Sequence, residues 1–121
     1  MSNVRKPAKK TLVAENLFTA LHIGASSVSL MVAERAEDGS LTPVDFLEQP
    51  APVARDIFRN GEVSASTTER VVSIIKGYQK SISELGLDPH GVTRAVATNI
   101  LSEAGNHETF MNRIRIACGL R

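Results

Sequence analysis

The spacing of hydrophobic residues along the first half of the chain predicts three strands. Two short runs rich in large apolar residues, at 17–23 and 28–34, flank a turn of small residues, which is typical of paired strands. A third strand is predicted over residues 41–53, with Pro50 and Pro52 weakening its end because proline cannot donate to a ladder.

The second half of the chain alternates helices and strands. Apolar residues recur three and four positions apart from Ser66 to Leu85, which predicts a helix that ends at Gly86. A short buried strand is predicted over 92–97, then a short helix through Ala104 and a longer one over 108–118. The predicted order is β-β-β-α-β-α, which indicates a mixed sheet in an α/β domain.

Composition limits what such a domain can do. The 121 residues suffice for one domain but not for two full lobes. Hydrophobic residues make up 42% and charged residues 22%, as in ordinary globular proteins. Aromatic residues make up only 4%, without tryptophan, which argues against stacking platforms for bases. A net charge of +1 provides no general attraction to nucleic acid.

The N-terminus and the single cysteine indicate the compartment. Residues 1–16 are basic and contain few residues that could be buried, so we interpret them as a flexible tail preceding a domain over 17–121. Cys118 lies in an apolar helical stretch, which is typical of a buried thiol in a reducing compartment. No apolar run approaches the roughly 20 residues needed to cross a bilayer. We therefore expect a cytoplasmic protein without a membrane partner.

Two turns have residues suited to phosphate. The turn at Gly24, Ser26 and Ser27 lets backbone N–H groups converge on an anion, and the two serines add hydroxyl donors. A plain hairpin turn would explain the same residues. Thr98 and Asn99 lie where a strand is predicted to give way to a helix, whose free N–H groups can hold a phosphate oxygen. Helix capping alone would also explain this pair.

Longer motifs around these turns resemble a known family. Residues 21–30, LHIGASSVSL, are similar to the first signature of the exopolyphosphatase/guanosine pentaphosphate phosphohydrolase (Ppx/GppA) family. Residues 93–106, TRAVATNILSEAGN, together with Cys118-Gly119-Leu120, resemble its second signature, and residues 60–64, NGEVS, resemble a turn between the two. The resemblance covers about residues 17–121 and matches the N-terminal portion of the family.

The resemblance implies a ribonuclease H-like lobe of the actin-like ATPase superfamily. Family enzymes release orthophosphate from terminal phosphoanhydrides with a divalent cation, Mg²⁺, and a Glu-activated water, in a cleft between two lobes. It implies that this chain binds polyphosphate or a guanosine pentaphosphate-like anion. The other partners that it implies are the C-terminal part of such a protein and, as an option, a second copy of the chain.

Three positions depart from the family pattern. His22 replaces an aspartate that helps to organise the cation, and Ser29 and Ser102 replace arginines that pair with phosphate. Imidazole substitutes poorly for a carboxylate around Mg²⁺, and a hydroxyl lacks the charge and fork of a guanidinium. The family's catalytic glutamate follows the segment that matches Gly119-Leu120.

The sequence therefore predicts no catalytic or metal-ligating residue, no tightly bound cofactor and only weak anion binding by this chain. Whether the chain belongs to an enzyme stays open at this point. A phosphohydrolase portion that is inactive alone is the first hypothesis. The alternatives are a non-catalytic module that senses polyphosphate or nucleotides, and an adaptor that uses the basic tail.

Overall fold

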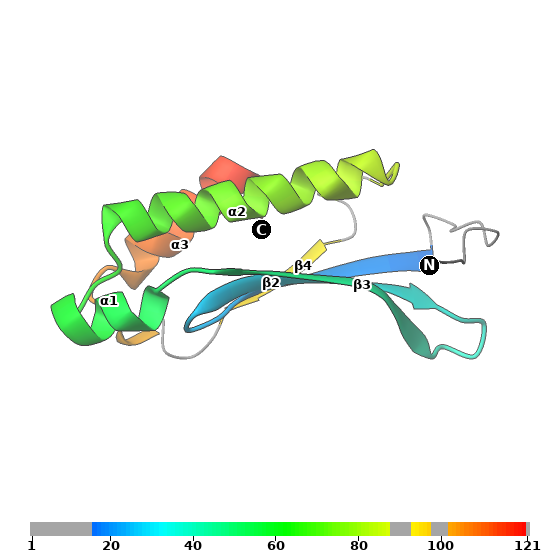
Figure 1. Cartoon of the computed structure of the whole chain (residues 1–121), viewed down its shortest axis with the longest axis horizontal. Coiled ribbons are helices and arrows are strands. Elements are labelled where there is room, and N and C mark those ends of the chain that lie inside the picture. The colour runs from blue at the N-terminus through cyan, green and yellow to red at the C-terminus, as the bar shows by residue number, and fades with distance from the viewer. Residues whose placement is uncertain (1–15, 88–92, 98–101, 121) are drawn as a thin grey trace, which may run out of the picture.

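A computed structural model describes residues 16–87, 93–97 and 102–120. Three strands are followed by two helices, a fourth strand and a last helix (Figure 1). The elements are β1 (Leu17–Ile23), β2 (Ser27–Arg35), β3 (Leu41–Pro50), α1 (Val53–Asn60), α2 (Ala65–Glu84), β4 (Thr93–Ala97) and α3 (His107–Cys118).

The strands form one mixed sheet in the order β3-β2-β1-β4. β1 pairs antiparallel with β2, and β2 with β3, whereas β4 lies parallel to β1. Parallel strands require a crossover connection, and α2 provides it here. The predicted α/β class, with three meandering strands and a parallel fourth, is confirmed.

Helices α2 and α3 lie together over one face of this sheet (Figure 1). Tyr78 of α2 fixes that packing, because its buried hydroxyl donates to the Val28 carbonyl of β2 at 2.7 Å. Arg113 of α3 forms two 2.8 Å hydrogen bonds with Glu69 of α2, which join the two helices at their exposed side. The centre of the core consists of fully buried side chains from both layers: Leu17, Leu21, Ile23, Val28, Leu30, Val71, Ile75, Ile82, Phe110 and Ile114.

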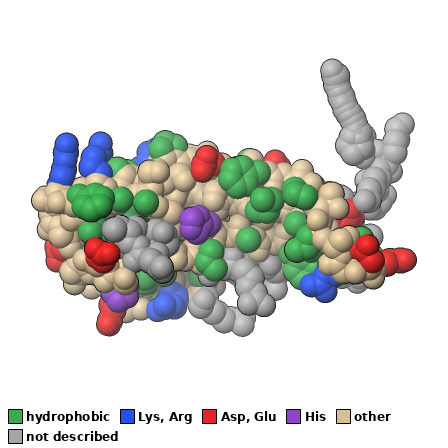
Figure 2. Space-filling view, turned by 90° about the horizontal axis from the view of Figure 1, so that it is seen from below, with side chains coloured by type: hydrophobic (Ala, Val, Ile, Leu, Met, Phe, Trp, Pro, Cys, Tyr) green, Lys and Arg blue, Asp and Glu red, His purple; other side chains and the backbone are tan. Residues whose placement is uncertain are grey.

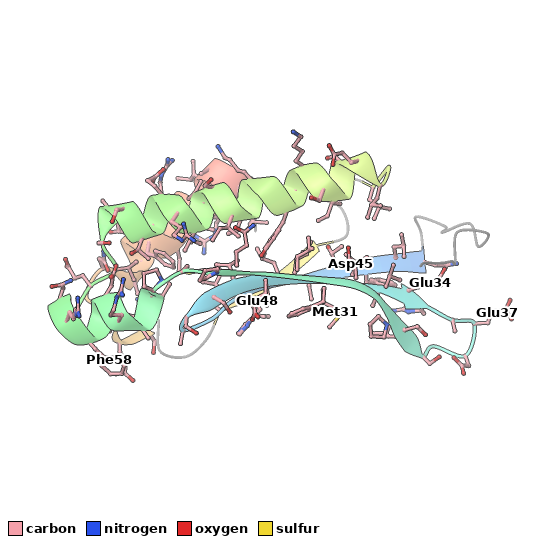
Figure 3. All side chains as sticks on the ribbon, viewed as in Figure 1. Met31, Glu34, Glu37, Asp45, Glu48 and Phe58 are labelled. Carbon is pink, nitrogen blue, oxygen red and sulfur yellow. The ribbon has the colours of Figure 1, made fainter. Side chains whose placement is uncertain are left out.

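The opposite face of the sheet is left open by the described elements (Figure 1). Met31 points away from α2 on this side (Figure 3), and its register partner on β3, Phe46, is 53% exposed. Viewed from this side, apolar side chains lie around a central histidine (Figure 2). Strand alternation explains the two faces, because each β1 side chain that is buried under the helices is followed by one that is not.

Helix α1 corrects the predicted order, which is β-β-β-α-α-β-α. The third strand ends at Pro50 rather than residue 53, and α1 follows over residues of which only Val53 lay in a predicted element. With eight residues and only Val53 and Ile57 buried, α1 is too short to establish a recognisable period. Gly61 ends it in the left-handed conformation, at φ +73°.

The two longer predicted helices, 66–85 and 108–118, are confirmed within two residues. Helix α2 begins at a Ser64 cap, whose Oγ accepts from the Thr67 N–H at 3.1 Å, and Gly86 follows it at φ +84°. Cys118 is buried as expected, and burial raises the pKa of its thiol. Of the short helix predicted through Ala104, the structure describes a 3₁₀ turn at 102–103. The predicted tail, 1–16, falls outside the described residues except for its last position.

Among the described residues, no helix is both long and apolar enough for a membrane span.

Candidate phosphate-binding site

The Gly24–Ser27 turn lies at the end of the sheet where its parallel strands finish. Ile23 and Ala97, the last residues of β1 and β4, are register partners, so their carboxyl ends lie side by side. Helix α1 and the segment before α3 occupy the same end of the molecule (Figure 1). In open α/β sheets this is where ligands bind.

The turn is closed tightly and leaves two amides exposed. The Gly24 N–H donates to the Ser27 carbonyl at 2.8 Å, and a Cβ on Gly24 would lie only 3.1 Å from that oxygen. Glycine is therefore needed for close approach. The N–H groups of Ala25 and Ser26 find no acceptor among the described residues, and both residues are exposed. Paired backbone N–H groups of this kind suit an anion.

Helix α1 and the segment just before it hold the turn in place by donating hydrogen bonds to the carbonyl groups of the turn. The Ala25 carbonyl accepts from the Ala54 N–H at 2.8 Å, and the Ser26 carbonyl accepts from the Ala51 N–H at 2.9 Å. These bonds occupy the Ala25 and Ser26 carbonyl groups but not their N–H groups. The turn therefore presents hydrogen-bond donors to solvent.

The two serines of the turn have different surroundings. The Ser27 hydroxyl donates to Glu48 Oε2 at 3.0 Å, so it is already engaged. The carboxylate also places negative charge beside Ser27, which disfavours phosphate on that side. The Ser26 hydroxyl has no hydrogen-bond partner within the described part of the chain. Of the two, Ser26 is the better phosphate donor.

Strand pairing brings together two of the three positions that differ from the family pattern. His22 and Ser29 are register partners on the open face, and Glu48 is the partner of Ser29 on β3. Ser29 is 9% exposed. Ser102 lies apart in sequence, in the 3₁₀ turn before α3. Thr98 and Asn99 lie outside the described residues, so their predicted role stays a prediction.

The residues around the turn do not fit a hard divalent cation. Magnesium prefers an octahedral set of oxygen ligands with one or two carboxylates. The groups near this turn are the His22 imidazole and the Glu48 carboxylate, and the carboxylate already accepts a hydrogen bond from Ser27. Within the ranges that the structure describes, no three His, Cys, Asp or Glu side chains gather as a metal site would require.

Two arginines beside the turn were missed by the sequence analysis. Arg55 of α1 and Arg70 of α2 line a shallow groove of about 580 Å³ next to Ala25 and Ser26. Exposed arginines on helices are ordinary in sequence, and α1 itself was not predicted, so no sequence signal marked them. The space-filling view shows basic side chains standing out at the α1 end of the molecule (Figure 2).

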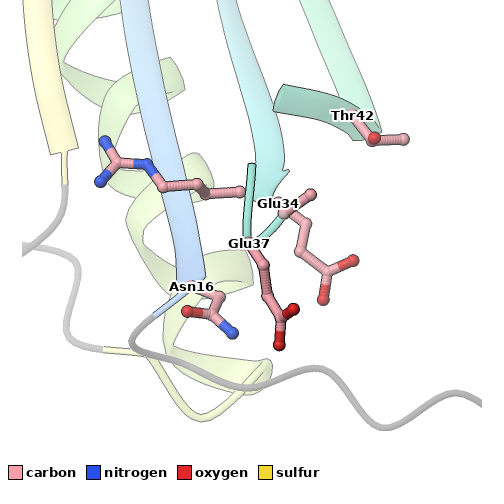
Figure 4. A pocket seen from close by; sticks show the side chains of 6 residues that line it. Asn16, Glu34, Glu37 and Thr42 are labelled. Atoms are coloured by element: carbon pink, nitrogen blue, oxygen red, sulfur yellow. The ribbon is translucent and has the colours of Figure 1, made fainter. Parts of the chain in front are cut away.

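The other end of the sheet has the opposite charge. A hollow of about 280 Å³ is lined there by Glu34, Glu37 and Thr42, among others (Figure 4). Arg35 also lines this hollow, and its guanidinium lies over the Phe18 ring, 4.4 Å from the ring centre. With two carboxylates against one arginine, the lining of this hollow is negative overall, which disfavours phosphate.

Comparison with known proteins identifies the fold. No family profile matches the sequence. The structure is similar to the Ppx/GppA family member of Aquifex aeolicus, with a TM-score of 0.76 and 26% identity over 86% of this chain. A crystal structure described as the type II variant of the Aquifex aeolicus Ppx/GppA phosphatase gives a TM-score of 0.75 at the same identity. An exopolyphosphatase from Cytophaga hutchinsonii shares the fold, at a TM-score of 0.74 and 12% identity.

The chain spans about a third of the length of these proteins, 33% of the Aquifex protein and 32% of the Cytophaga one. The matched sheet has the topology that the two sequence signatures implied, and its turn lies where the first signature places it. The chain therefore matches the N-terminal portion of Ppx/GppA phosphatase structures and shares their actin-like fold.

Proposed function

We propose that this chain is the phosphate-loop lobe of a Ppx/GppA-type phosphohydrolase that acts on terminal phosphoanhydrides. Its ligand is inorganic polyphosphate or a guanosine pentaphosphate-like anion, and the terminal phosphate is held at the Gly24–Ser27 turn. The observation that supports this is the pair of exposed amides at Ala25 and Ser26, at the carboxyl ends of the parallel strands.

The turn supplies binding rather than chemistry. Two backbone N–H groups and the Ser26 hydroxyl are neutral donors, each contributing about 0.5–1.5 kcal/mol net. The carboxylate that contacts the turn, Glu48, accepts a hydrogen bond from Ser27 and faces the open side of the sheet. A general base must reach the water that it activates. In this proposal the base therefore comes from outside the described residues, and the chain alone does not release phosphate.

A second function is supported by two departures from the family pattern on the open face. His22 and Ser29 are neighbours there, without the carboxylate and guanidinium that the resemblance leads one to expect. A lobe that keeps the phosphate turn but not these charges suits a non-catalytic sensor of polyphosphate or nucleotides. The two functions predict the same binding and differ in turnover.

Phosphate release and binding should be measured on the same protein. We expect calorimetry to detect tripolyphosphate binding, no orthophosphate release with Mg²⁺ present, and ¹⁵N NMR shifts at the Ala25 and Ser26 amides. Release that a substitution in this chain abolishes would contradict the first function. Binding that leaves both amides unshifted would remove the turn from the site.

A chimaera separates the lobe of an enzyme from a sensor. This chain would replace the matched third of the Aquifex family member, with circular dichroism to verify folding. Phosphate release by the chimaera supports the enzyme. Binding without release, with release gained only after H22D, S29R and S102R together, supports the sensor.

A further inference from the structure

We infer that the groove between α1 and α2 is the second half of the anion site, where Arg55 and Arg70 bind the phosphates that follow the terminal one. This inference rests on the proposed function, because it extends the same site. The ligand class is a chain of linked phosphates, either inorganic polyphosphate or the polyphosphate of a nucleotide. The groove adjoins the turn directly, since Ala25 and Ser26 line both.

Arg70 is already fixed in the groove. It comes from the first turns of α2, and its Nε donates to the Pro50 carbonyl at 2.8 Å. No described residue accepts a hydrogen bond from its terminal Nη groups. A guanidinium fixed through Nε loses less freedom when the Nη groups bind a phosphate oxygen.

Arg55 is not held in a salt bridge by Asp56, its neighbour in the chain. The Asp56 carboxylate accepts from the Ser64 N–H at 2.9 Å. Burial raises the pKa of Asp56, but hydrogen bonds from Thr67 and Ser64, with a smaller contribution from the Arg55 charge, outweigh it and lower the pKa overall. The carboxylate is thus committed to the start of α2. Among the described residues, Arg55 forms no salt bridge.

The floor of the groove strengthens these charges. Pro50, Ala51 and Pro52 line it, and Ala51 is fully buried. Apolar walls lower the local dielectric and increase the attraction between guanidinium and phosphate. The other side of the turn has the Glu48 carboxylate, so the charges direct an anion towards the groove and away from the open sheet face.

This arrangement accounts for the neutral Ser29 and Ser102. The positive charge that is absent at those two positions is present instead at Arg55 of α1 and Arg70 of α2. A single orthophosphate on the turn is too short to reach along the groove, whereas three linked phosphates extend into it. Affinity should therefore rise with the number of phosphates.

The test is calorimetry with tripolyphosphate on R55Q, R70Q and the double variant. We expect the double variant to bind at least about tenfold more weakly and with a flatter salt dependence, because two charge-assisted contacts are lost. Orthophosphate binding should change less. Arg59 is the matched control, an arginine in the last turn of α1 that does not line the groove, and R59Q should bind within about twofold of wild type.

Wild-type affinity in the double variant would overturn the inference. Since R70Q also removes the bond to Pro50, R70K serves as a second variant that keeps the charge, and it should retain more affinity than R70Q. Tighter binding of guanosine pentaphosphate than of tripolyphosphate would identify a nucleotide as the ligand. Equal binding would identify inorganic polyphosphate.

NMR separates failure of this inference from failure of the proposed function. Shifts at the Ala25 and Ser26 amides with no effect of the arginine variants would reject the groove and keep the turn. Shifts at the Arg55 and Arg70 Nε–H signals with silent turn amides would reject the turn and keep the groove. An absence of tripolyphosphate binding by the wild type would reject both.

Discussion

At the turn end of the sheet, hydrogen bonds join residues far apart in sequence, whereas at the hairpin end they join neighbours. Ala25 is bonded to Ala54, and the Gly105 N–H donates to the Gly61 carbonyl at 2.7 Å. At the hairpin between β2 and β3, Asp38 accepts from the backbone and hydroxyl of Ser40, two residues away. The first end depends on the whole fold, and the second depends on its own sequence.

The two ends also differ in charge. Arg55 and Arg70 line the groove at the turn end, and Glu34 and Glu37 line the hollow at the hairpin end. A binding site needs donors held at fixed positions, and long-range bonds supply that rigidity. The comparison therefore shows that the exposed amides of Ala25 and Ser26 lie at the end of the sheet that long-range hydrogen bonds hold rigid.

The largest expected effect is the loss of stability on substitution of Asn106, which joins the start of α3 to the segment between α1 and α2. Its Oδ1 accepts from the Val63 N–H at 3.0 Å, and its Nδ2 donates to the Val63 carbonyl at 2.8 Å. Val63 is buried, so Asn106→Ala leaves both of its backbone groups unpaired. We expect a loss of about 2–3 kcal/mol in the free energy of unfolding, measured by urea denaturation.

The matched change at the hairpin end is Asp38→Ala. It also removes two hydrogen bonds, but they are local and exposed. We expect no measurable change in the unfolding midpoint. Similar losses in the two variants would show that the two ends are held equally.

Asp56→Asn should have an intermediate effect, dependent on pH. The substitution keeps an acceptor for Ser64 but removes the charge, at a cost of about 1 kcal/mol at pH 7. Because folding lowers the pKa of Asp56, its contribution is complete above the unfolded value of about 3.9 and is lost as the pH falls through the folded value. Wild type and variant should therefore converge below about pH 3.9. A difference that stays constant down to pH 3 would contradict this account.

The sequence predicted the parts of this structure that repeat a period. Alternation in β1 and the three- and four-residue spacing around Ile75 extend over enough residues to define an element and its buried face. Helix α1 could not be predicted, since two buried residues define no period and its position depends on a backbone hydrogen bond from Ala54 to Ala25.

The candidate site was predicted in part, for a similar reason. The Gly24–Ser27 turn is marked by its own residues, so sequence alone could find it. The engagement of Ser27 by Glu48 joins residues 21 positions apart, and the groove joins Arg55 to Arg70 through tertiary packing. Such pairs follow from the register of the strands and the packing of the helices, neither of which is written in a local motif.

The smallest expected effect is a gain in affinity from Glu48→Gln. This change removes the negative charge beside the turn and leaves the Ser27 hydroxyl a weaker, neutral acceptor, so the hydroxyl can donate to phosphate more readily. We expect tripolyphosphate to bind about threefold to fivefold more tightly at low salt, the size of one screened charge, with the gain vanishing at high salt. Glu37→Gln, at the hairpin end, removes the same charge and should leave affinity unchanged.

Ser29→Arg sharpens the same test, because position 29 is the register partner of Glu48. An arginine introduced there would pair with that carboxylate and contribute little to phosphate. In the Glu48→Gln background the same arginine has no carboxylate opposite it, so it should add affinity. A gain from Ser29→Arg that is equal in both backgrounds, measured by calorimetry as a double-mutant cycle, would show that Glu48 does not control charge at the turn.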